Sequence, residues 1–369
     1  MFYVLLTWLA SPLLFLRLKL TSRNKSSKCH ILVIQTAKIG DVICTTPIFR
    51  EIKRNRPNAK LTVLCSSVTA PLLELNPHVD STLVFDTKTL AGISGKFRFA
   101  QLLKAQKVDI SICLSPNLAF LLIPFWVAVS TRVSVLPNFF GLTYTLSEPF
   151  LTHSVKHRQG QLFVDTMLMA LTELAFDVRL RHKDVFSRDG SDAKVRALLG
   201  TSWSSALIGV GIGSGNKLKS LPQDTLENLI RLILDKTDRD VVLIGSGDDQ
   251  RTSDTLCRIF ASARVLNAVN RFALQELPAL LERLTAYVGV DSGVTYMADA
   301  VGISVVDIMG PADPEDQRPT GQSARIIKTN LPCAPCSHTF QAPYRCAIGT
   351  RACVVDLTAE TIFEHIAVQ

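Results

Sequence analysis

The feature that most constrains the fold of this chain is a repeated alternation of short apolar runs with amphipathic stretches, which starts at His30. Short apolar runs bounded by turn residues are typical of buried strands, and a period of about 3.6 residues is typical of helices. Strands that alternate with helices favour a parallel sheet covered on both faces. Because the alternation occurs in both halves of the chain, the sequence predicts two open α/β sheets.

The predicted elements divide evenly between the halves. In the first half the predicted strands are residues 30–36, 60–66, 81–86, 108–114 and 131–136, and the predicted helices are 42–56, 70–75, 97–106, 118–129 and 161–175. Residues 137–159 are rich in Pro, Asn, Gly, Ser and His and are predicted to be a loop. In the second half the predicted strands are 206–211, 240–245, 265–269, 286–290 and 304–309, and the predicted helices are 223–235, 248–261, 274–284, 294–301 and 358–366. Two Rossmann-like halves of this kind are expected to face a ligand cleft at the carboxyl ends of their strands.

Length and charge narrow the classes of protein. A chain of 369 residues favours two domains. We predict an apolar and basic membrane-associating segment over residues 1–28, one Rossmann-like domain over 29–185, and a second over 186–369 that ends in a cysteine-rich tail and a terminal helix. The net charge of +8 favours phosphorylated ligands or an anionic membrane. No motif interleaves aromatic with basic residues, so no nucleic-acid partner is predicted.

The N-terminus carries an uncharged, mostly apolar run over residues 2–16, and basic residues follow it at Arg17, Lys19, Arg23, Lys25 and Lys28. A spanning helix needs about 20 apolar residues, and this shorter run contains Pro12. A signal peptide would carry its charges before the run. We therefore expect an interfacial anchor on anionic headgroups. A short signal-anchor and a helix packed on the protein body are the alternatives, and both membrane hypotheses leave the body in the cytoplasm.

The first motif that carries chemistry runs from Ala37 to Val42, after a predicted buried strand and at the start of a helix. Gly40 allows a close approach of backbone, and a helix N-terminus attracts anions. Asp41 favours the helix dipole as a residue of the first turn. As a carboxylate at the end of a strand it could instead accept a proton from a nucleophile. Taken alone, the motif favours the first interpretation.

The second motif is a glycine-rich loop from Gly209 to Gly215 that contains Gly213 and Ser214 and leads to Lys217 and Lys219. Glycines free backbone amides to meet a phosphate, and the lysines supply charge. The spacing matches neither a Walker loop nor a dinucleotide fingerprint. A flexible turn with solvated lysines is the alternative.

Two further motifs follow predicted strands. At Asp291-Ser292-Gly293 a strand turns into a helix, so the amides of Ser292, Gly293, Val294 and Thr295 are predicted to face phosphate oxygens, with the Ser292 and Thr295 hydroxyls as extra donors. A plain helix cap is the alternative. Asp248, after another strand, could hold ribose hydroxyls or simply cap a helix.

In their order and spacing these motifs resemble glycosyltransferase family 9, the lipopolysaccharide heptosyltransferases. The resemblance rests on Gly40-Asp41-Val42, on Lys219 before Pro222, on Gly289 to Gly293 and on Gly310-Pro311-Ala-Asp313-Pro314, and it extends from about His30 to the C-terminus. It implies a GT-B fold, an inverting transfer of a sugar, most typically heptose from ADP-heptose, and no required cofactor. The implied acceptor is a lipopolysaccharide core or a related anionic glycolipid at the inner face of the cytoplasmic membrane.

The resemblance also implies roles for individual residues. Asp41 would be the general base in the acceptor domain, where Lys38 and Gly40 would contact the acceptor. The donor-binding residues would be Lys219, Asp291, Ser292, Gly293, Val294, Thr295, Tyr296, Gly213, Ser214 and Asp248. Family members commonly have His at the position of Tyr296, Lys-Arg-Trp-Pro at residues 219–222, and Ala or a similar residue at Asp299. These differences are expected to affect the donor pocket. A non-catalytic nucleotide-sugar-binding protein and an epimerase of the same architecture are the alternatives.

The chain has nine cysteines, of which Cys333, Cys336, Cys346 and Cys353 lie near the C-terminus. A Cys-x2-Cys pair with two further cysteines could form a structural zinc site, although the outer spacings are irregular. Reduced thiols or a redox pair are the alternatives. The other five cysteines lie in apolar runs and are predicted to be core residues.

Overall fold

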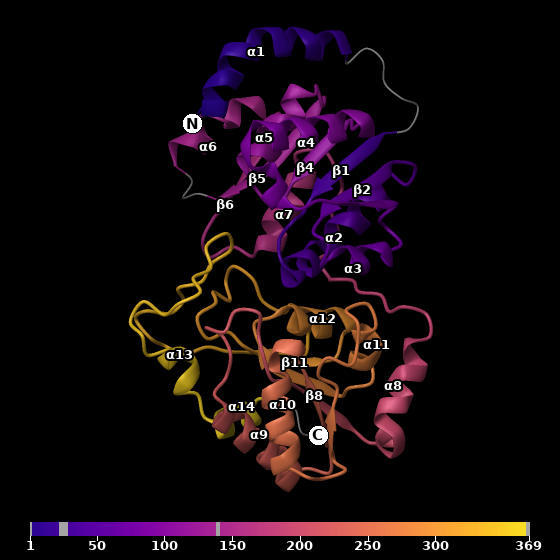
Figure 1. The fold of residues 1–369 in the computed structure, drawn as a ribbon, viewed down its shortest axis with the longest axis vertical. Coiled ribbons are helices and arrows are strands. Elements are labelled where there is room, and N and C mark those ends of the chain that lie inside the picture. Colours follow the sequence, from indigo (N-terminus) through magenta and orange to yellow (C-terminus); the bar gives the residue numbers. More distant parts are fainter. Residues whose placement is uncertain (1, 22–28, 138–140, 367–369) are drawn as a thin grey trace. The chain divides into compact units, whose positions relative to one another are not determined.

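The computed structural model describes residues 2–21, 29–137 and 141–366 (Figure 1). The chain divides into two compact units, Met1–Arg181 (unit 1) and His182–Gln369 (unit 2). The predicted boundary between residues 185 and 186 lies slightly later in the chain. Three basic residues of the predicted N-terminal anchor, Arg23, Lys25 and Lys28, lie outside the described residues.

Unit 1 contains a parallel sheet of six strands in the order β3-β2-β1-β4-β5-β6. The strands are β1 (His30–Ile34), β2 (Lys60–Cys65), β3 (Ser81–Val84), β4 (Ile110–Cys113), β5 (Thr131–Pro137) and β6 (His153–His157). All residues of β1 and β4 are buried, as expected for central strands covered on both faces. The strand order reverses direction between β1 and β4. The carboxyl ends of these two strands therefore form the topological switch point of unit 1, where α/β sheets bind ligands.

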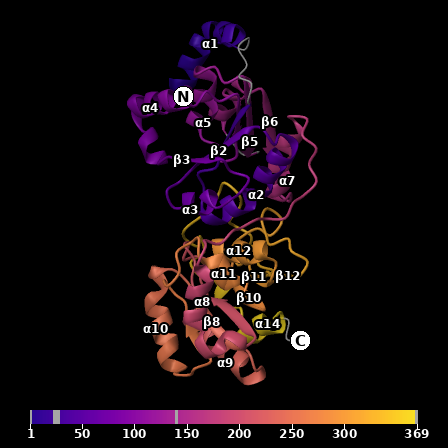
Figure 2. The ribbon, with the colours of Figure 1, turned by 90° about the vertical axis from the view of Figure 1, so that its right-hand side faces the viewer.

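Helices cover both faces of this sheet. They are α2 (Ile39–Asn55), α3 (Ala70–Glu74), α4 (Gly92–Gln106), α5 (Leu118–Trp126), α6 (Leu142–Thr145) and α7 (Phe163–Thr172), with short 3-10 turns at Thr87–Leu90 and Glu148–Phe150. Figure 2 shows α4 and α5 on one side of the sheet and α2 and α7 on the other. Phe99 of α4 and Phe120 of α5 pack against Leu32 and Ile34 of β1 in the core.

The five strands predicted for the first half are present, but residues 137–159 are not all loop. Residues His153–His157 form β6, which pairs in parallel with β5 from Val133↔His153 to Pro137↔His157. The sequence did not predict this strand because the segment His-Ser-Val-Lys-His contains a single apolar residue. It lies at the edge of the sheet, where one side of the strand has no neighbour and polar residues are tolerated.

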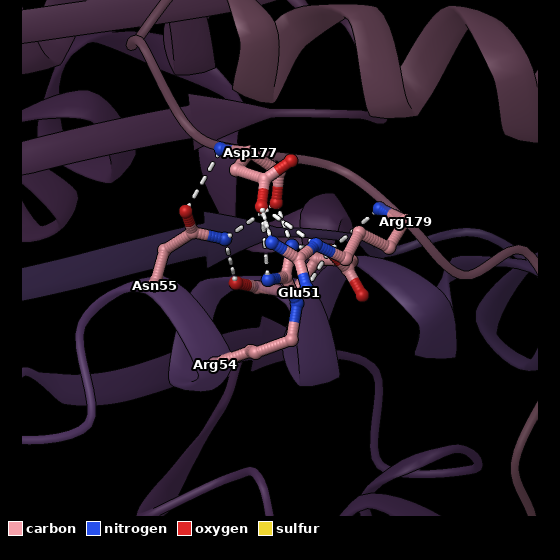
Figure 3. A network of polar contacts seen from close by, with 5 residues as sticks. All are labelled: Glu51, Arg54, Asn55, Asp177 and Arg179. Carbon is pink, nitrogen blue, oxygen red and sulfur yellow. Dashed lines mark hydrogen bonds and ion pairs between the residues drawn. The ribbon is translucent and has the colours of Figure 1, made fainter.

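A network of polar contacts fixes the end of unit 1 to the last turn of α2 (Figure 3). The Glu51 side chain has no exposed surface, accepts from Arg54 Nη2 at 2.6 Å and accepts from the Arg179 backbone at 3.0 Å. Asn55 exchanges two hydrogen bonds with the backbone of Asp177, at 2.8 and 2.9 Å. Asp177 also pairs with Arg179, and this hydrogen bond lowers the pKa of the Asp177 carboxyl. The charged stretch that follows α7 is thus ordered by α2.

Unit 2 repeats the plan with a parallel sheet in the order β12-β11-β10-β7-β8-β9. Its strands are β7 (Leu207–Gly211), β8 (Asp240–Ile244), β9 (Val265–Asn267), β10 (Ala286–Val290), β11 (Ser304–Ile308) and β12 (Ala324–Ile327). Its helices are α8 (Ser191–Leu199), α9 (Gln223–Lys236), α10 (Gln250–Ile259), α11 (Leu277–Leu281), α12 (Gly293–Val301), α13 (Ala352–Val355) and α14 (Ala359–Glu364), with 3-10 turns at Gly200–Ser204 and Gly247–Asp249. The edge strand β12 and the helices α8 and α13 were not predicted. The switch point of unit 2 lies between β10 and β7.

The N-terminal apolar helix is present as α1 (Phe2–Thr21), which continues through Pro12 and is longer than the predicted run. Among the described helices it is the one that is long and apolar enough to cross a membrane by length and composition. It also packs on unit 1, where Val4 is fully buried beside Leu122 and Phe125 of α5. The helix therefore has a protein-facing side, as the packing alternative predicted.

Candidate functional site

Asp41 lies in the first turn of α2, directly after the carboxyl end of β1 at the switch point of unit 1. It is half-buried, and one carboxylate oxygen accepts from the backbone amide of Lys38 at 3.2 Å. The predicted first-turn contact therefore exists, but it uses one oxygen of a side chain that also has exposed surface. Lys38 is exposed and Gly40 is buried. The geometry is compatible both with helix capping and with a carboxylate that accepts a proton.

A neutral network that the sequence did not reveal positions the loop before Asp41. Gln35 is buried at the end of β1 and donates from Nε2 to Thr45 Oγ1 at 2.8 Å. Its Oε1 accepts from Ser115 Oγ, which follows β4, and from the amide of Ala37 at 3.3 Å. Ser115 Oγ in turn accepts from the amide of Thr36 at 3.1 Å. These bonds connect the ends of β1 and β4 and hold residues 36–38 in place.

In unit 2 the structure brings together three predicted donor residues, Lys219, Asp291 and Tyr296. Lys219 Nζ donates to one oxygen of Asp291, and Tyr296 Oη donates to the other at 2.6 Å. Tyr296 is almost fully buried, and both side chains of the Lys219–Asp291 pair are mostly buried. Lys219 follows β7 and Asp291 follows β10, so this group lies at the switch point of the sheet.

The Asp291 loop opens α12, whose N-terminus presents unpaired amide donors in the way that anion sites do. Ser292, Gly293 and Val294 are half-buried and remain partly accessible. The sequence predicted that the Thr295 hydroxyl donates to phosphate oxygens, and the structure contradicts this prediction. Thr295 has no exposed surface, and its hydroxyl donates to the backbone of Val290 at 2.6 Å. Thr295 therefore stabilises the turn from β10 into α12, and its Oγ1 accepts a hydrogen bond from Ser292 Oγ at 3.1 Å.

The glycine-rich loop after β7 is held by Asn216 and Asp249. Ser214 is buried and accepts from the amide of Asn216 at 3.3 Å. Lys217 Nζ forms an ion pair with Asp249 at 2.8 Å, and a side chain at Gly213 would overlap with the Asp249 carboxylate. Asp248, the predicted ribose ligand, is exposed on the 3-10 turn. The neighbouring Asp249 is the acid that reaches the loop, a residue that sequence reasoning passed over.

A second missed acid, Asp307, lies inside β11 next to Gly289 of β10. It has no exposed surface, and neither carboxyl oxygen has a hydrogen-bond partner among the described residues. Burial, and next the Asp291 carboxylate, raise the pKa of Asp307 well above its ordinary value. The surroundings of this carboxyl therefore favour its neutral form. This acid could have been singled out from the sequence, because it lies inside the apolar run 304–309 that predicts a buried strand.

Asp299, which is expected to affect the donor pocket, forms a buried ion pair whose lysine lies 5.9 Å from the centre of the Tyr296 ring. Its carboxylate pairs with the buried Lys183 at 2.7 Å and accepts from the amides of Thr320 and Gly321 at 3.1 and 2.8 Å. Lys183 also donates to Thr320 Oγ1 at 3.0 Å. The pair connects the start of unit 2 to α12 and to the loop that follows the Gly310–Pro314 motif.

The C-terminal cysteines do not form a close set of ligand atoms. Cys333 and Cys336 are exposed, Cys346 is half-buried and Cys353 is buried, and all four are reduced. Within the described ranges, one group of three or more candidate ligands lies within 4.8 Å, and it consists of Asp313, Asp316 and His338. The zinc site on the cysteines stays a prediction. Of the predicted core cysteines, Cys44, Cys65 and Cys113 are buried, whereas Cys29 and Cys257 are half-buried.

Four matches with known proteins agree with one another. A model of glycosyltransferase family 9 (heptosyltransferase) matches residues 96–344. Lipopolysaccharide heptosyltransferase 3 of Escherichia coli is 22% identical over 280 residues, which cover 74% of this chain and 81% of the relative. A family 9 glycosyl transferase from Veillonella parvula DSM 2008 has a TM-score of 0.77 at 20% identity and covers 93% of this chain and 97% of its own. ADP-heptose lps heptosyltransferase II of E. coli has a TM-score of 0.69 at 18% identity, with coverages of 91% and 97%.

Proposed function

The chain belongs to glycosyltransferase family 9 and is a glycosyltransferase of the heptosyltransferase type, and from this premise we propose that it moves heptose from ADP-heptose to a lipopolysaccharide core or a related glycolipid. The observation that carries the proposal is the Lys219–Asp291–Tyr296 group at the switch point of unit 2, beside the N-terminus of α12. This combination of a lysine, a fixed carboxylate and free helix amides suits a sugar diphosphate. The E. coli relative described above is named for ADP-heptose.

In the proposed donor complex the diphosphate lies between Lys219 and the N-terminus of α12. Without donor, Lys219 is paired with Asp291. A diphosphate carries more charge than one carboxylate and attracts Lys219 and the amides of Gly293 and Val294. Asp291 then has an oxygen available for sugar hydroxyls, while Tyr296 holds its other oxygen.

In the proposed transfer step Asp41 acts as the general base. The acceptor hydroxyl loses its proton to the Asp41 carboxylate as its oxygen attacks the anomeric carbon. The new C–O bond forms on the face opposite to the diphosphate, the bond from the anomeric carbon to the diphosphate oxygen breaks, and ADP leaves with the electron pair. Lys219 and the helix amides stabilise the charge on the departing diphosphate, so this step requires no metal ion.

The proposed acceptor is an anionic glycolipid that Lys38 and the backbone at Gly40 contact. Lys38 is exposed at the N-terminus of α2, where the helix dipole adds to its positive charge. A lipid-linked acceptor places the enzyme at the inner face of the cytoplasmic membrane.

The test combines binding with product analysis. We expect ADP-heptose to raise the melting temperature more than UDP-, GDP- or TDP-sugars, because a ligand that binds only the folded state stabilises it. Mass spectrometry of a heptose-deficient lipopolysaccharide acceptor should then show the addition of one heptose. Stabilisation without product would indicate a non-catalytic binding protein, and an isomerised sugar nucleotide with an unchanged acceptor would indicate an epimerase. Either result would overturn the proposal.

A further inference from the structure

Helix α1 has two stripes of residues on opposite sides, and the protein covers one of them. The covered stripe consists of Val4, Thr7, Ser11, Leu14 and Leu18, whose spacing of three and four residues places them on one face. The opposite stripe, which we call the α1 outer face, is exposed. It consists of Phe2, Leu5, Leu6, Leu9, Leu13, Leu16 and Leu20. Leu9 and Leu13 are 80% and 74% exposed, so this face lacks a protein partner in the described part of the chain.

Specific hydrogen bonds hold the covered side of α1 on unit 1. Trp126 of α5 donates to Thr7 Oγ1 at 2.9 Å, and Trp8 donates to the backbone of Leu146 at 2.9 Å. Near the other end of the helix, Arg17 donates to the backbone of Trp126 at 3.2 Å. Ring contacts of Trp8 with Phe150 and of Phe15 with Phe125, at 5.0 and 4.9 Å between centroids, add to these bonds. A helix attached along its length cannot cross a bilayer unless these contacts break.

Helix α4, which lies beside the start of α1, adds exposed apolar side chains to unit 1. Lys96 of α4 lies over the Tyr3 ring at 4.1 Å, which places α4 beside the start of α1. Ile93 and Phe97 of α4 are 68% and 62% exposed. Exposed apolar side chains on two neighbouring helices are typical of an interaction site.

The charge around the α1 outer face has one sign. Helices α1, α4 and α6 contain no Asp or Glu, whereas Arg17, Lys19 and Arg98 are exposed on α1 and α4. A broad apolar face with a basic rim is complementary to the headgroup region of an anionic bilayer.

We propose that the α1 outer face, together with Ile93 and Phe97, is a monotopic docking surface for an anionic phospholipid leaflet. In this arrangement α1 lies parallel to the membrane plane with its apolar side chains at the boundary between headgroups and acyl chains. Its basic residues contact lipid phosphates. The surface would keep unit 1 beside a lipid-linked acceptor without a spanning segment. The contacts that carry this inference belong to unit 1 alone and do not depend on the sugar that is transferred.

The first experiment is vesicle flotation of the full chain, without donor or acceptor. We expect binding to vesicles of phosphatidylethanolamine and phosphatidylglycerol, and weaker binding to phosphatidylcholine alone. The variant Leu9→Glu/Leu13→Glu should reduce the partition coefficient at least about tenfold, because two apolar side chains no longer leave water. Its matched control is Ile259→Glu/Val355→Glu, which adds the same charge at two exposed apolar residues of unit 2 and should bind as the unchanged protein does. Equal binding by both variants would overturn the proposal.

Two further measurements distinguish the other occupants of this surface. Alkaline carbonate should release the bound protein, whereas resistance to extraction would show a spanning helix and overturn the proposal. Light scattering without lipid should show the same oligomeric state for the unchanged protein and for Leu9→Glu/Leu13→Glu. A dimer that the variant dissociates would assign the surface to a second copy of the chain and overturn the proposal. The same variant should transfer sugar to a lipid-free acceptor fragment at the unchanged rate. If the unchanged protein transfers sugar but does not bind vesicles, the docking proposal fails and the proposed function stands. If it binds vesicles but does not transfer sugar, the proposed function fails and the docking proposal stands.

Discussion

The two switch points of this enzyme are built on the same topology but from opposite chemistry. In unit 1 the ends of β1 and β4 are joined by the neutral side chains of Gln35 and Ser115, and Asp41 follows them. In unit 2 the ends of β7 and β10 are joined by the charged pair of Lys219 and Asp291. A general base needs a carboxylate, which unit 1 supplies in Asp41, whereas a site for a diphosphate needs cations and amides, which unit 2 supplies. The difference therefore supports a division of labour in which unit 1 activates the acceptor and unit 2 binds the donor.

The largest expected effect comes from breaking the buried charges of unit 2. Lys183→Met leaves the Asp299 carboxylate buried without its cation and should destabilise unit 2 by about 3–5 kcal/mol. Ser115→Ala in unit 1 removes a neutral hydrogen bond and should cost about 1 kcal/mol. Urea unfolding followed by circular dichroism measures both. The double variant Lys183→Met/Asp299→Asn should recover more than half of the loss, and equal costs for the two single variants would contradict the contrast between the units.

The next prediction concerns turnover. Asp41→Asn keeps the size of the side chain but cannot accept the proton, so turnover should fall by about 100-fold or more. Donor affinity should stay near normal, because Asp41 belongs to unit 1. Lys219→Met should show the opposite pattern and mainly weaken donor binding. Initial rates measure the turnover of each variant, and calorimetric titration with ADP measures its affinity for the donor nucleotide. Near-normal turnover of Asp41→Asn would remove Asp41 from the mechanism.

Tyr296 offers a finer test of the donor site. Tyr296→Phe removes the hydroxyl that donates to Asp291 at 2.6 Å, and the loss of such a bond to a charged group should weaken ADP-heptose binding by about tenfold. Tyr296→His restores a donor of the kind that family members commonly have at this position. It should recover most of the affinity. If Tyr296→Phe and Tyr296→His bind the donor with the same affinity, the Tyr296 hydroxyl does not orient Asp291 for the donor.

The smallest expected effect is a change in pH dependence. Burial alone would raise the pKa of Asp249, but hydrogen bonds from Lys217 and Ser246 outweigh it and lower the pKa below its ordinary value. A lowered folded-state pKa stabilises the protein above the unfolded-state pKa, and this contribution disappears as the pH falls through the folded-state pKa. Lys217→Met should therefore make the stability of unit 2 less dependent on pH in the acid range. Acid titration of the unfolding midpoint measures this, and an unchanged slope would contradict the assignment.

Much of the fold and the broad site was predictable because it depends on local pattern. Buried strands of parallel sheets are continuous apolar runs, so ten of the strands were readable, while the polar edge strand β6 and the short β12 were not. The loops at Asp41, Lys219 and Asp291 were found because glycines and acids directly follow such runs. The same local reasoning failed for side-chain direction. It predicted an accessible Thr295 hydroxyl, whereas that hydroxyl is buried and donates to the backbone of Val290.

By itself, the sequence determined the two α/β halves, the order of the motifs and an apolar N-terminal helix, because each follows from residue spacing along one short segment. Only the tertiary structure decided which charges meet. Lys219 and Asp291 are 72 residues apart in the sequence, and Lys183 and Asp299 are 116 residues apart. It also decided that one side of α1 is covered while the other is exposed. Such pairings depend on how strands are ordered in a sheet and on which surfaces remain uncovered, and neither property is encoded in the periodicity of a single element.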